Sequence, residues 1–125
     1  MATEQIKYMT TIFLLVLAVV ILVVSGQVLW KMGVGGQIHD LASFLTAIKS
    51  PLVLLGAFLY LIATAIWIVM LSRYSYHFVY PLLSLSFVLA LIASRFIFHE
   101  EVSWLAWLGV GVICFGITLI GFSGR

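Results

Sequence analysis

Two cationic side chains stand at the ends of long apolar runs, and their chemistry suits the binding of an anion. Lys31 ends the first run and Gln27 precedes it by four residues, so a helix would place both on one face. Arg95 lies near the end of the third run, where a planar guanidinium could bind phosphate or carboxylate. Either cation could instead reach the water at the end of its helix, or Arg95 could pair with Glu100 or Glu101.

A helix turning 100° per residue would bring Tyr80, Ser84 and Arg95 to one side of the third apolar run. The two hydroxyls could then hydrogen-bond a phosphate or a sugar beside the guanidinium. Pro81 would stand in about the first turn of this helix, where its missing N–H has little cost. The spacing therefore predicts a polar stripe, followed at the membrane edge by Glu100, which could bind a cation or titrate.

Aromatic and glycine residues on the second and fourth apolar runs are typical of helix packing. Tyr60 and Trp67 fall on one stripe of the second run, which could line a substrate groove or fill a helix interface. Gly109 and Gly116 are seven residues apart and face the same way, and small residues let membrane helices approach closely. We therefore expect Gly109 and Gly116 to make a contact between helices or between subunits.

The remaining polar residues form no catalytic or metal-binding pattern. The sequence has no nucleophile beside a base, no HExxH motif and no glycine-rich phosphate loop, and its one cysteine, Cys114, lies in an apolar run. We therefore expect neither an enzyme nor a cofactor nor a metal site. A net charge of +2 without a basic run argues against nucleic acid as a partner.

The composition predicts a membrane protein. Of the 125 residues, 65% are hydrophobic and 8% are charged, whereas ordinary globular chains are about 25% charged. A spanning helix needs about 20 apolar residues, and the sequence predicts four such helices, at about 9–30, 52–71, 78–98 and 102–122. A short interfacial helix is expected at about 40–49, with Asp40 as its N-cap. The predicted fold class is all-α, with residues 1–125 forming a single four-helix transmembrane domain.

The cationic residues give no orientation, because the two sides of the predicted bundle hold three each. One side has Lys7, Arg73 and Arg125, and the other has Lys31, Lys49 and Arg95. One explanation is that the positive-inside rule is unreliable when a chain has so few charges. The other is dual topology, in which copies insert in both orientations and pair antiparallel. The first run exceeds the roughly 7–15 residues of a signal-peptide core, and no small-residue cleavage site follows, so we expect it to remain as a span.

Several segments resemble the small multidrug resistance type of the drug/metabolite transporter superfamily. Residues 25–31 (SGQVLWK) are similar to that family's Gly-x-x-x-x-Lys helix ending. Residues 79–88 (VYPLLSLSFV), 99–103 (HEEVS) and 107–117 (WLGVGVICFGI) resemble an EamA-like half-repeat. Together they are similar to the four-helix subunits that flip aminoarabinose attached to undecaprenyl phosphate.

The resemblance implies a multi-pass transporter of the cell inner membrane that moves a polyprenyl phosphate-linked sugar or a related anionic lipid. It implies a dimer, either of two identical chains or of this chain with a four-helix paralogue, packed antiparallel around a groove. The residues expected to bind the substrate are Lys31, Arg95, Gln27, Tyr80, Ser84, Tyr60, Trp67 and Glu100. Of these, Lys31 and Arg95 are the expected phosphate ligands.

One departure separates the chain from the proton-coupled multidrug exporters of this type. Those exporters carry a glutamate within the first span, and this chain has Val23 at that position. A cation held at mid-membrane needs a compensating charge, so the first span is unsuited to a cationic drug. Export of cationic or zwitterionic compounds through Glu100 or Glu101 remains the second hypothesis. The third is an accessory membrane subunit that moves nothing by itself.

Overall fold

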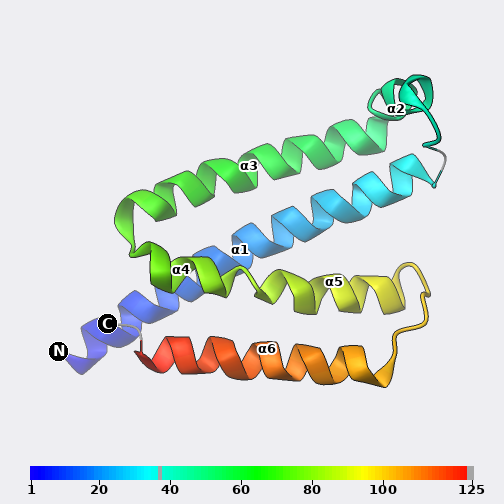
Figure 1. Ribbon diagram of the computed structural model, residues 1–125. Helices are drawn as coiled ribbons and strands as arrows, with labels where there is room; N and C mark the ends of the chain where they lie inside the picture. The colour runs from blue at the N-terminus through cyan, green and yellow to red at the C-terminus, as the bar shows by residue number, and fades with distance from the viewer. Residues whose placement is uncertain (37, 124–125) are drawn as a thin grey trace.

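The protein is a bundle of α-helices in the computed structural model, which describes residues 1–36 and 38–123 (Figure 1). The helices are α1 (Ala2–Val34), α2 (Leu41–Ala47), α3 (Pro51–Arg73), α4 (Tyr76–Leu82), α5 (Leu85–Phe96) and α6 (Trp104–Ser123). Within the described residues, four helical stretches are long and apolar enough to span a membrane, and α4 with α5 forms the third. The predicted all-α class with four spanning helices is confirmed. Arg125, which entered the charge comparison, lies outside the described residues.

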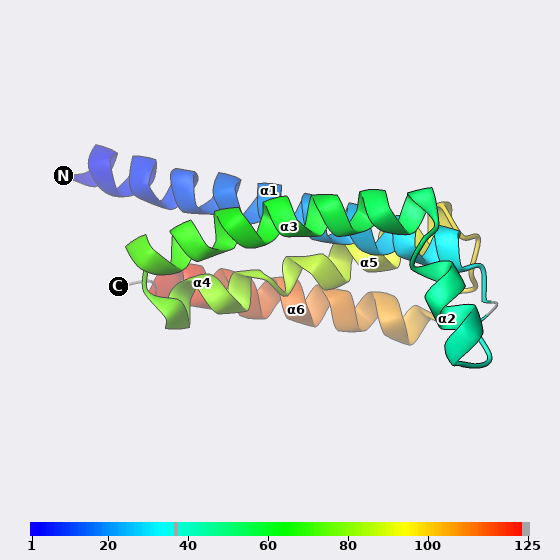
Figure 2. The same cartoon turned by 90° about the horizontal axis from the view of Figure 1, so that it is seen from above.

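The connections between helices gather at two ends of the bundle (Figures 1 and 2). The α1–α2, α2–α3 and α5–α6 connections lie at one end, which we call the loop end (residues 31–36, 38–41, 47–51 and 97–103). The α3–α4 turn lies at the other, which we call the terminal end (residues 1–9, 73–76 and 119–123). α1 has 33 residues, or about 50 Å of helix, against a hydrocarbon core of about 30 Å. α1 is therefore longer than the predicted span, because its hydrogen bonding continues through the polar residues before it.

The buried core follows α1 where it faces α3 and α4. The largest fully buried side chains belong to these three helices and are Ile12, Val16, Val20, Met70 and Val79. They are small or aliphatic, and they pack in the plane between helices where neither lipid nor water reaches them. The packing along this face holds α1 in place, and with it the polar residues of its last two turns.

α1 and α3 cross with their backbones in direct approach. A Cβ added to Gly26 would lie 2.8 Å from the carbonyl oxygen of Gly56, and a Cβ added to Gly56 would lie 2.6 Å from that of Gly26. Trp30 covers the same crossing, because its indole N–H donates to the Val53 carbonyl at 3.0 Å. Its ring also stacks on Tyr60, with the centroids 5.3 Å apart. The crossing thus fixes the rotation of the last turns of α1.

The third span is broken between α4 and α5. Pro81 lies near the end of α4, so the prediction that it stands in the first turn is wrong. Four backbone N–H groups between residues 83 and 87 bond to carbonyls three residues back, and the Ser84 hydroxyl donates to the Pro81 carbonyl at 2.5 Å. Such tighter turns hold about three residues each. The prediction that Tyr80, Ser84 and Arg95 share one helix face assumed a uniform 100° per residue. The tighter turns of the break change that angle, so the prediction does not hold across it.

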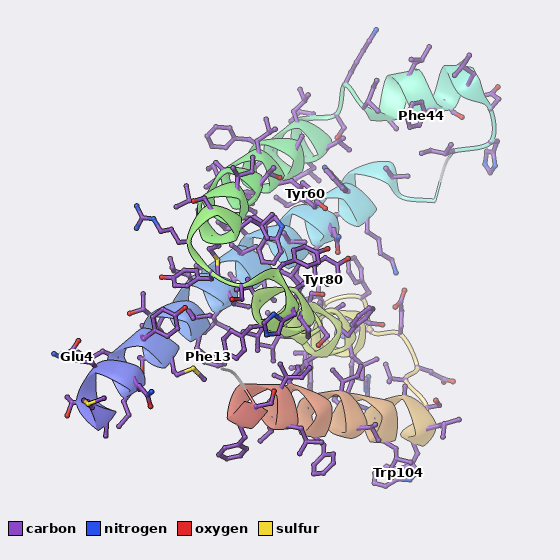
Figure 3. All side chains as sticks on the ribbon, turned by 60° about the vertical axis from the view of Figure 1, so that its left-hand side comes forward. Glu4, Phe13, Phe44, Tyr60, Tyr80 and Trp104 are labelled. Atoms are coloured by element: carbon purple, nitrogen blue, oxygen red, sulfur yellow. The ribbon has the colours of Figure 1, made fainter. Side chains whose placement is uncertain are left out.

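α2 is a single short helix that stands off the bundle at the loop end, as the Phe44 label in Figure 3 shows. Asp40 is its N-cap, as predicted, and its carboxylate accepts the backbone N–H of Ser43 at 2.8 Å. That hydrogen bond is the main reason why the pKa of Asp40 lies below its usual value. The helix has no buried residue, and its place along the membrane interface stays a prediction.

α6 lies at the edge of the bundle against α4 and α5, and it buries none of its described residues. A Cβ added to Gly109 or to Gly116 would have nothing within 4 Å. Of the two contacts expected for these glycines, the one with another helix of the same chain is therefore absent from the described residues. Ser103 begins the helix, and its hydroxyl accepts the backbone N–H of Ala106 at 3.3 Å.

Candidate functional site

A groove of about 210 Å³ lies between the last turns of α1 and the end of α5, at the loop end of the bundle. We call it the Lys31 groove. Its lining residues are Val24, Gln27, Val28, Lys31, Ala90, Ala93, Ser94, Phe98 and Glu100. The deeper part is apolar because it is made of valine and alanine side chains, and the polar groups stand toward the loop end. A ligand with a polar head and an apolar body would match this gradient.

Lys31 is held between a carboxylate and an aromatic ring. Its ammonium forms an ion pair with Glu100, a residue of the α5–α6 connection, 69 positions away in the sequence. Its Nζ also lies 4.5 Å from the centre of the Phe98 ring, in the geometry of a cation–π contact. The side chains of Lys31 and Glu100 are 54% and 43% exposed. Both charges are therefore within reach of a ligand that arrives from the headgroup layer.

Ser94 fixes the position of Glu100 twice. The Ser94 hydroxyl donates to the carboxylate of Glu100, and the Ser94 carbonyl accepts the backbone N–H of Glu100 at 3.0 Å. His99 makes this turn possible by adopting a left-handed φ of 53°. The hydrogen bond from Lys31, and after it the one from Ser94, hold the pKa of Glu100 below its usual value. Glu100 is therefore an ionised carboxylate at neutral pH.

Arg95 lies beside the Lys31 groove but does not line it. The groove is lined by the two preceding residues, Ala93 and Ser94, and each further residue of a helix turns by about 100°. The side chain of Arg95 is accordingly exposed. Glu100, one of the two acids considered as its partner, is bonded to Lys31 instead.

The predicted aromatic residues lie on α3 and α4, and none of them lines the groove. Tyr60 stacks on Trp30 at the α1–α3 crossing. Tyr80 stacks on Tyr76 with centroids 4.9 Å apart, and its ring centroid lies 6.4 Å from that of Trp67. Tyr60 and Trp67 thus each contact an aromatic ring of a neighbouring helix. These contacts favour a role in helix packing over one in lining a substrate groove.

Of the residues predicted to bind substrate, the structure brings three together in one groove: Gln27, Lys31 and Glu100. Sequence reasoning missed Ser94 and Phe98, which hold the two charges in place. A signal for Ser94 was present in the sequence, because small residues at 90, 93 and 94 mark one face of the third apolar run. For Phe98 there was none, since its role depends on a contact with another helix.

Curated relatives match nearly the whole chain. A protein of Aeromonas hydrophila, named a probable 4-amino-4-deoxy-L-arabinose-phosphoundecaprenol flippase subunit ArnE, is 35% identical over 108 residues, which are 86% of this chain and 95% of the relative. The Aeromonas salmonicida protein of the same name is 36% identical over a stretch of the same length and coverage. That of Pseudomonas fluorescens (strain Pf0-1) is 32% identical over 111 residues, 89% of this chain and 96% of the relative. No protein-family model and no solved structure matches the chain.

Proposed function

Because the chain belongs to the family of the 4-amino-4-deoxy-L-arabinose-phosphoundecaprenol flippase subunits, we propose that it carries a polyprenyl phosphate-linked amino sugar across a membrane. The observation that supports this most is the Lys31 groove, which presents one cation and one carboxylate beside an apolar floor. The lipid in the relatives' name carries the complementary set, a phosphate and an amine on one headgroup.

The headgroup would bind by exchanging one ion pair for two. The ammonium of Lys31 leaves Glu100 and binds the phosphate, and the carboxylate of Glu100 then binds the protonated amine of the sugar. Gln27 lies one turn before Lys31 and can hydrogen-bond the phosphate or the sugar. The groove never holds an unpaired charge in this exchange, which matters because an unpaired charge near hydrocarbon is costly.

The hydrocarbon chain of the substrate would remain in the bilayer while the headgroup crosses with the protein. The groove is open at the side, so no sealed cavity large enough for a polyprenyl chain is required. Transport then needs a second chain that completes the path to the other membrane face, by the rocking of paired repeats around a central site. A second copy of this chain or a four-helix paralogue would be that second chain. The printed name of the Aeromonas hydrophila relative, a flippase subunit, supports such a pairing. The bundle would lie in the cell inner membrane and perform no covalent chemistry.

The proposal is tested by Lys31→Ala, made in place of the natural chain in cells, with flipping measured in vesicles from their membranes. Transport should fall by at least about tenfold, since a hydrogen bond to a charged group contributes about 1.5–3 kcal/mol. Lys31→Arg should retain most of it. Lys49→Ala is the matched control, because Lys49 is an exposed cation at the same end that does not line the groove. Equal transport by Lys31→Ala and Lys49→Ala would contradict the proposal.

The two other hypotheses differ in what the isolated chain does. A proton-coupled exporter needs a carboxylate that is protonated near neutral pH, and the lowered pKa of Glu100 argues against that role for this residue. An accessory subunit would move nothing when purified and reconstituted alone. Flipping by vesicles that contain both this chain and its paralogue, but by neither alone, would support a heterodimer. Flipping by this chain alone would support a homodimer.

A further inference from the structure

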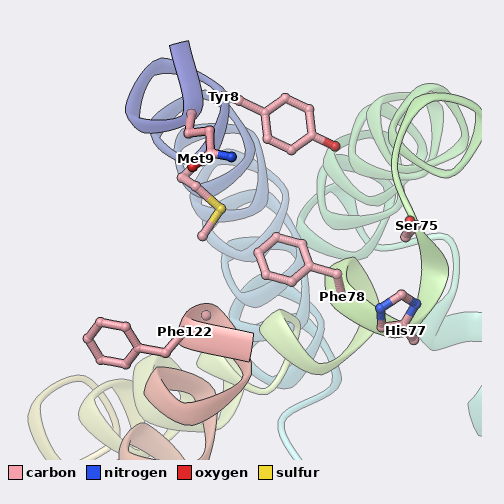
Figure 4. A pocket seen from close by; sticks show the side chains of 8 residues that line it. Tyr8, Met9, Ser75, His77, Phe78 and Phe122 are labelled. Carbon is pink, nitrogen blue, oxygen red and sulfur yellow. The ribbon is translucent and has the colours of Figure 1, made fainter. Parts of the chain in front are cut away.

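A second concave site lies at the terminal end, opposite the Lys31 groove. It consists of two adjoining cavities of about 530 and 340 Å³ between α1, α4 and α6, and Figure 4 shows the larger one. Met9, Phe78, Gly121 and Phe122 line both cavities, so the two form one continuous cleft. We call it the terminal cleft.

The inner part of the terminal cleft is apolar and reaches the lipid-facing surface. Its floor is formed by Ile12, Phe78 and Leu82, which are 1%, 7% and 5% exposed. Its rim is formed by Phe13 and Phe122, which are 47% and 84% exposed. The cleft therefore opens sideways, between α1 and α6, into the region that hydrocarbon would occupy.

The outer part of the terminal cleft is polar and lies at the membrane edge. It is lined by Gln5, Tyr8, Ser75 and His77, each of which can donate a hydrogen bond, and no carboxylate is among the described residues that line it. In Figure 4 the side chains of Ser75 and His77 stand on one side of Phe78, and Tyr8 and Met9 lie above it on α1. Hydrogen-bond donors without a carboxylate beside them suit a phosphate oxygen, which accepts hydrogen bonds and gives none when ionised.

We propose that the terminal cleft binds a lipid phosphate, with the hydrocarbon chain between α1 and α6 and the phosphate at Gln5, Tyr8, Ser75 and His77. The gradient from a buried apolar floor to a donor-rich mouth runs in the same sense as the gradient of such a lipid in a bilayer. The lipid could be a polyprenyl phosphate or an ordinary phospholipid, and both offer the same chemistry to this site. The site does not depend on the proposed transport, because its test measures occupancy rather than flipping.

The experiment uses the full chain in vesicles of phosphatidylethanolamine and phosphatidylglycerol, with lipid probes that carry a diazirine in the hydrocarbon chain. The probes are a polyprenyl phosphate, a phosphatidylglycerol and a phosphate-free polyprenol, and the adducts are mapped by mass spectrometry of peptides. Adducts of the two phosphate probes should concentrate on residues 9–13 and 117–122. Preference for the polyprenyl probe would identify the transported class of lipid as the source, and equal labelling would identify membrane phospholipid.

Gly121→Leu provides the matched disruption. A Cβ at Gly121 meets nothing within 4 Å, so a leucine there should fill the cleft without displacing its neighbours. We expect labelling of residues 9–13 to fall about tenfold, which corresponds to about 1.4 kcal/mol of binding free energy. Gly111→Leu is the control, because Gly111 is equally open and lies toward the other end of α6, outside the cleft. Circular dichroism should show that both variants keep their helices.

Three results would overturn the proposal. Adducts spread evenly over the exposed faces of α3 and α6 would mean that lipid only surrounds the bundle. Equal labelling by the phosphate-free polyprenol would mean that the mouth does not bind phosphate. Cross-links from residues 9–13 or 117–122 to a second protein chain would mean that a subunit occupies the cleft.

Discussion

α1 and α6 use glycine in opposite ways. In α1, Gly26 faces Gly56 of α3, and the two backbones approach so closely that neither position has room for a Cβ. In α6, Gly109 and Gly116 face open space, and the helix buries none of its described residues. The first pair of glycines closes a contact within the chain. The second leaves a surface on which another helix could pack.

The difference shows that glycine in a membrane helix permits a close approach but does not say whether a helix of the same chain makes it. Without a hydrophobic drive between helices in lipid, contact depends on how near the backbones can come. For Gly26 the neighbour is 30 positions away on α3. For α6 we propose that the neighbour is the partner subunit. The following tests separate these two uses, beginning with the largest expected effect.

Gly56→Leu should abolish the folded bundle. A Cβ at this position would lie 2.6 Å from the Gly26 carbonyl oxygen and 2.7 Å from the Trp30 ring, and the first of these is backbone that cannot rotate away. Overpacking of this kind typically costs about 1–3 kcal/mol and occasionally more, and here we expect at least about 3 kcal/mol. Titration with SDS, followed by circular dichroism, measures the loss. Gly111→Leu is the control, and its SDS midpoint should equal that of the parent. Equal SDS midpoints for Gly56→Leu and Gly111→Leu would contradict the close approach of α1 and α3 at Gly56.

The double change Gly109→Leu and Gly116→Leu should leave folding of the single chain intact and weaken subunit association. Nothing lies within 4 Å of a Cβ at either position. Glycine is about 0.8–1 kcal/mol less favourable than alanine in a helix interior, and leucine ranks just below alanine. Cross-linking in native membranes should show fewer dimers, while the SDS midpoint of the monomer stays the same or rises. Unchanged dimer yield would mean that the partner packs elsewhere. Gly111 lies on another face of α6, so Gly111→Leu should dimerise normally.

The spanning helices could be predicted from the sequence because lipid leaves the backbone no other way to satisfy its polar groups. The N-cap at Asp40 could be predicted as well, since the cap and its partner Ser43 are three residues apart. The ion pair of Lys31 could not, because Glu100 is 69 positions away and the sequence suggested Arg95, not Lys31, as the partner of Glu100 or Glu101. Long-range pairing depends on how α1 and α5 pack, which hydropathy does not encode.

The break in the third span escaped prediction for a different reason. A helix from 78 to 98 was expected to turn uniformly, and Arg95 was placed on the stripe of Tyr80 and Ser84 by that assumption. The turns around Ser84 are tighter, so residues on either side of the break change their relative angle. The groove therefore contains Ser94 where Arg95 was expected. On this geometry Arg95→Ala should reduce flipping less than Lys31→Ala does.

The Lys31–Glu100 pair ties α1 to the connection that precedes α6, and its pH dependence has a defined sign. The pKa of Glu100 in the folded chain is lower than its usual value, so the pair is present at neutral pH. The stability it contributes is complete above the usual glutamate value of 4.5 and is lost as the pH falls through the lower pKa of the folded chain. Binding of the amino-sugar lipid at pH 7 should therefore release no proton, as measured with a pH indicator in weak buffer. Proton release that disappears in Glu100→Gln would contradict this assignment.

His99→Gly should have the smallest effect, and it tests the turn that carries the chain from α5 to α6. His99 adopts a φ of 53°, which costs a residue with a side chain about 1–3 kcal/mol. Glycine removes that strain. It also makes the unfolded chain more flexible, which lowers the free energy of unfolding by about 0.5–1 kcal/mol, so the variant should be as stable as the parent or slightly more stable. The variant should also keep the Lys31–Glu100 pair and flip at the parent rate. A β-branched residue tolerates a left-handed φ poorly, so His99→Val should lower the SDS midpoint and weaken flipping together. Equal SDS midpoints and equal flipping rates for the two variants would mean that Glu100 reaches the groove without this turn.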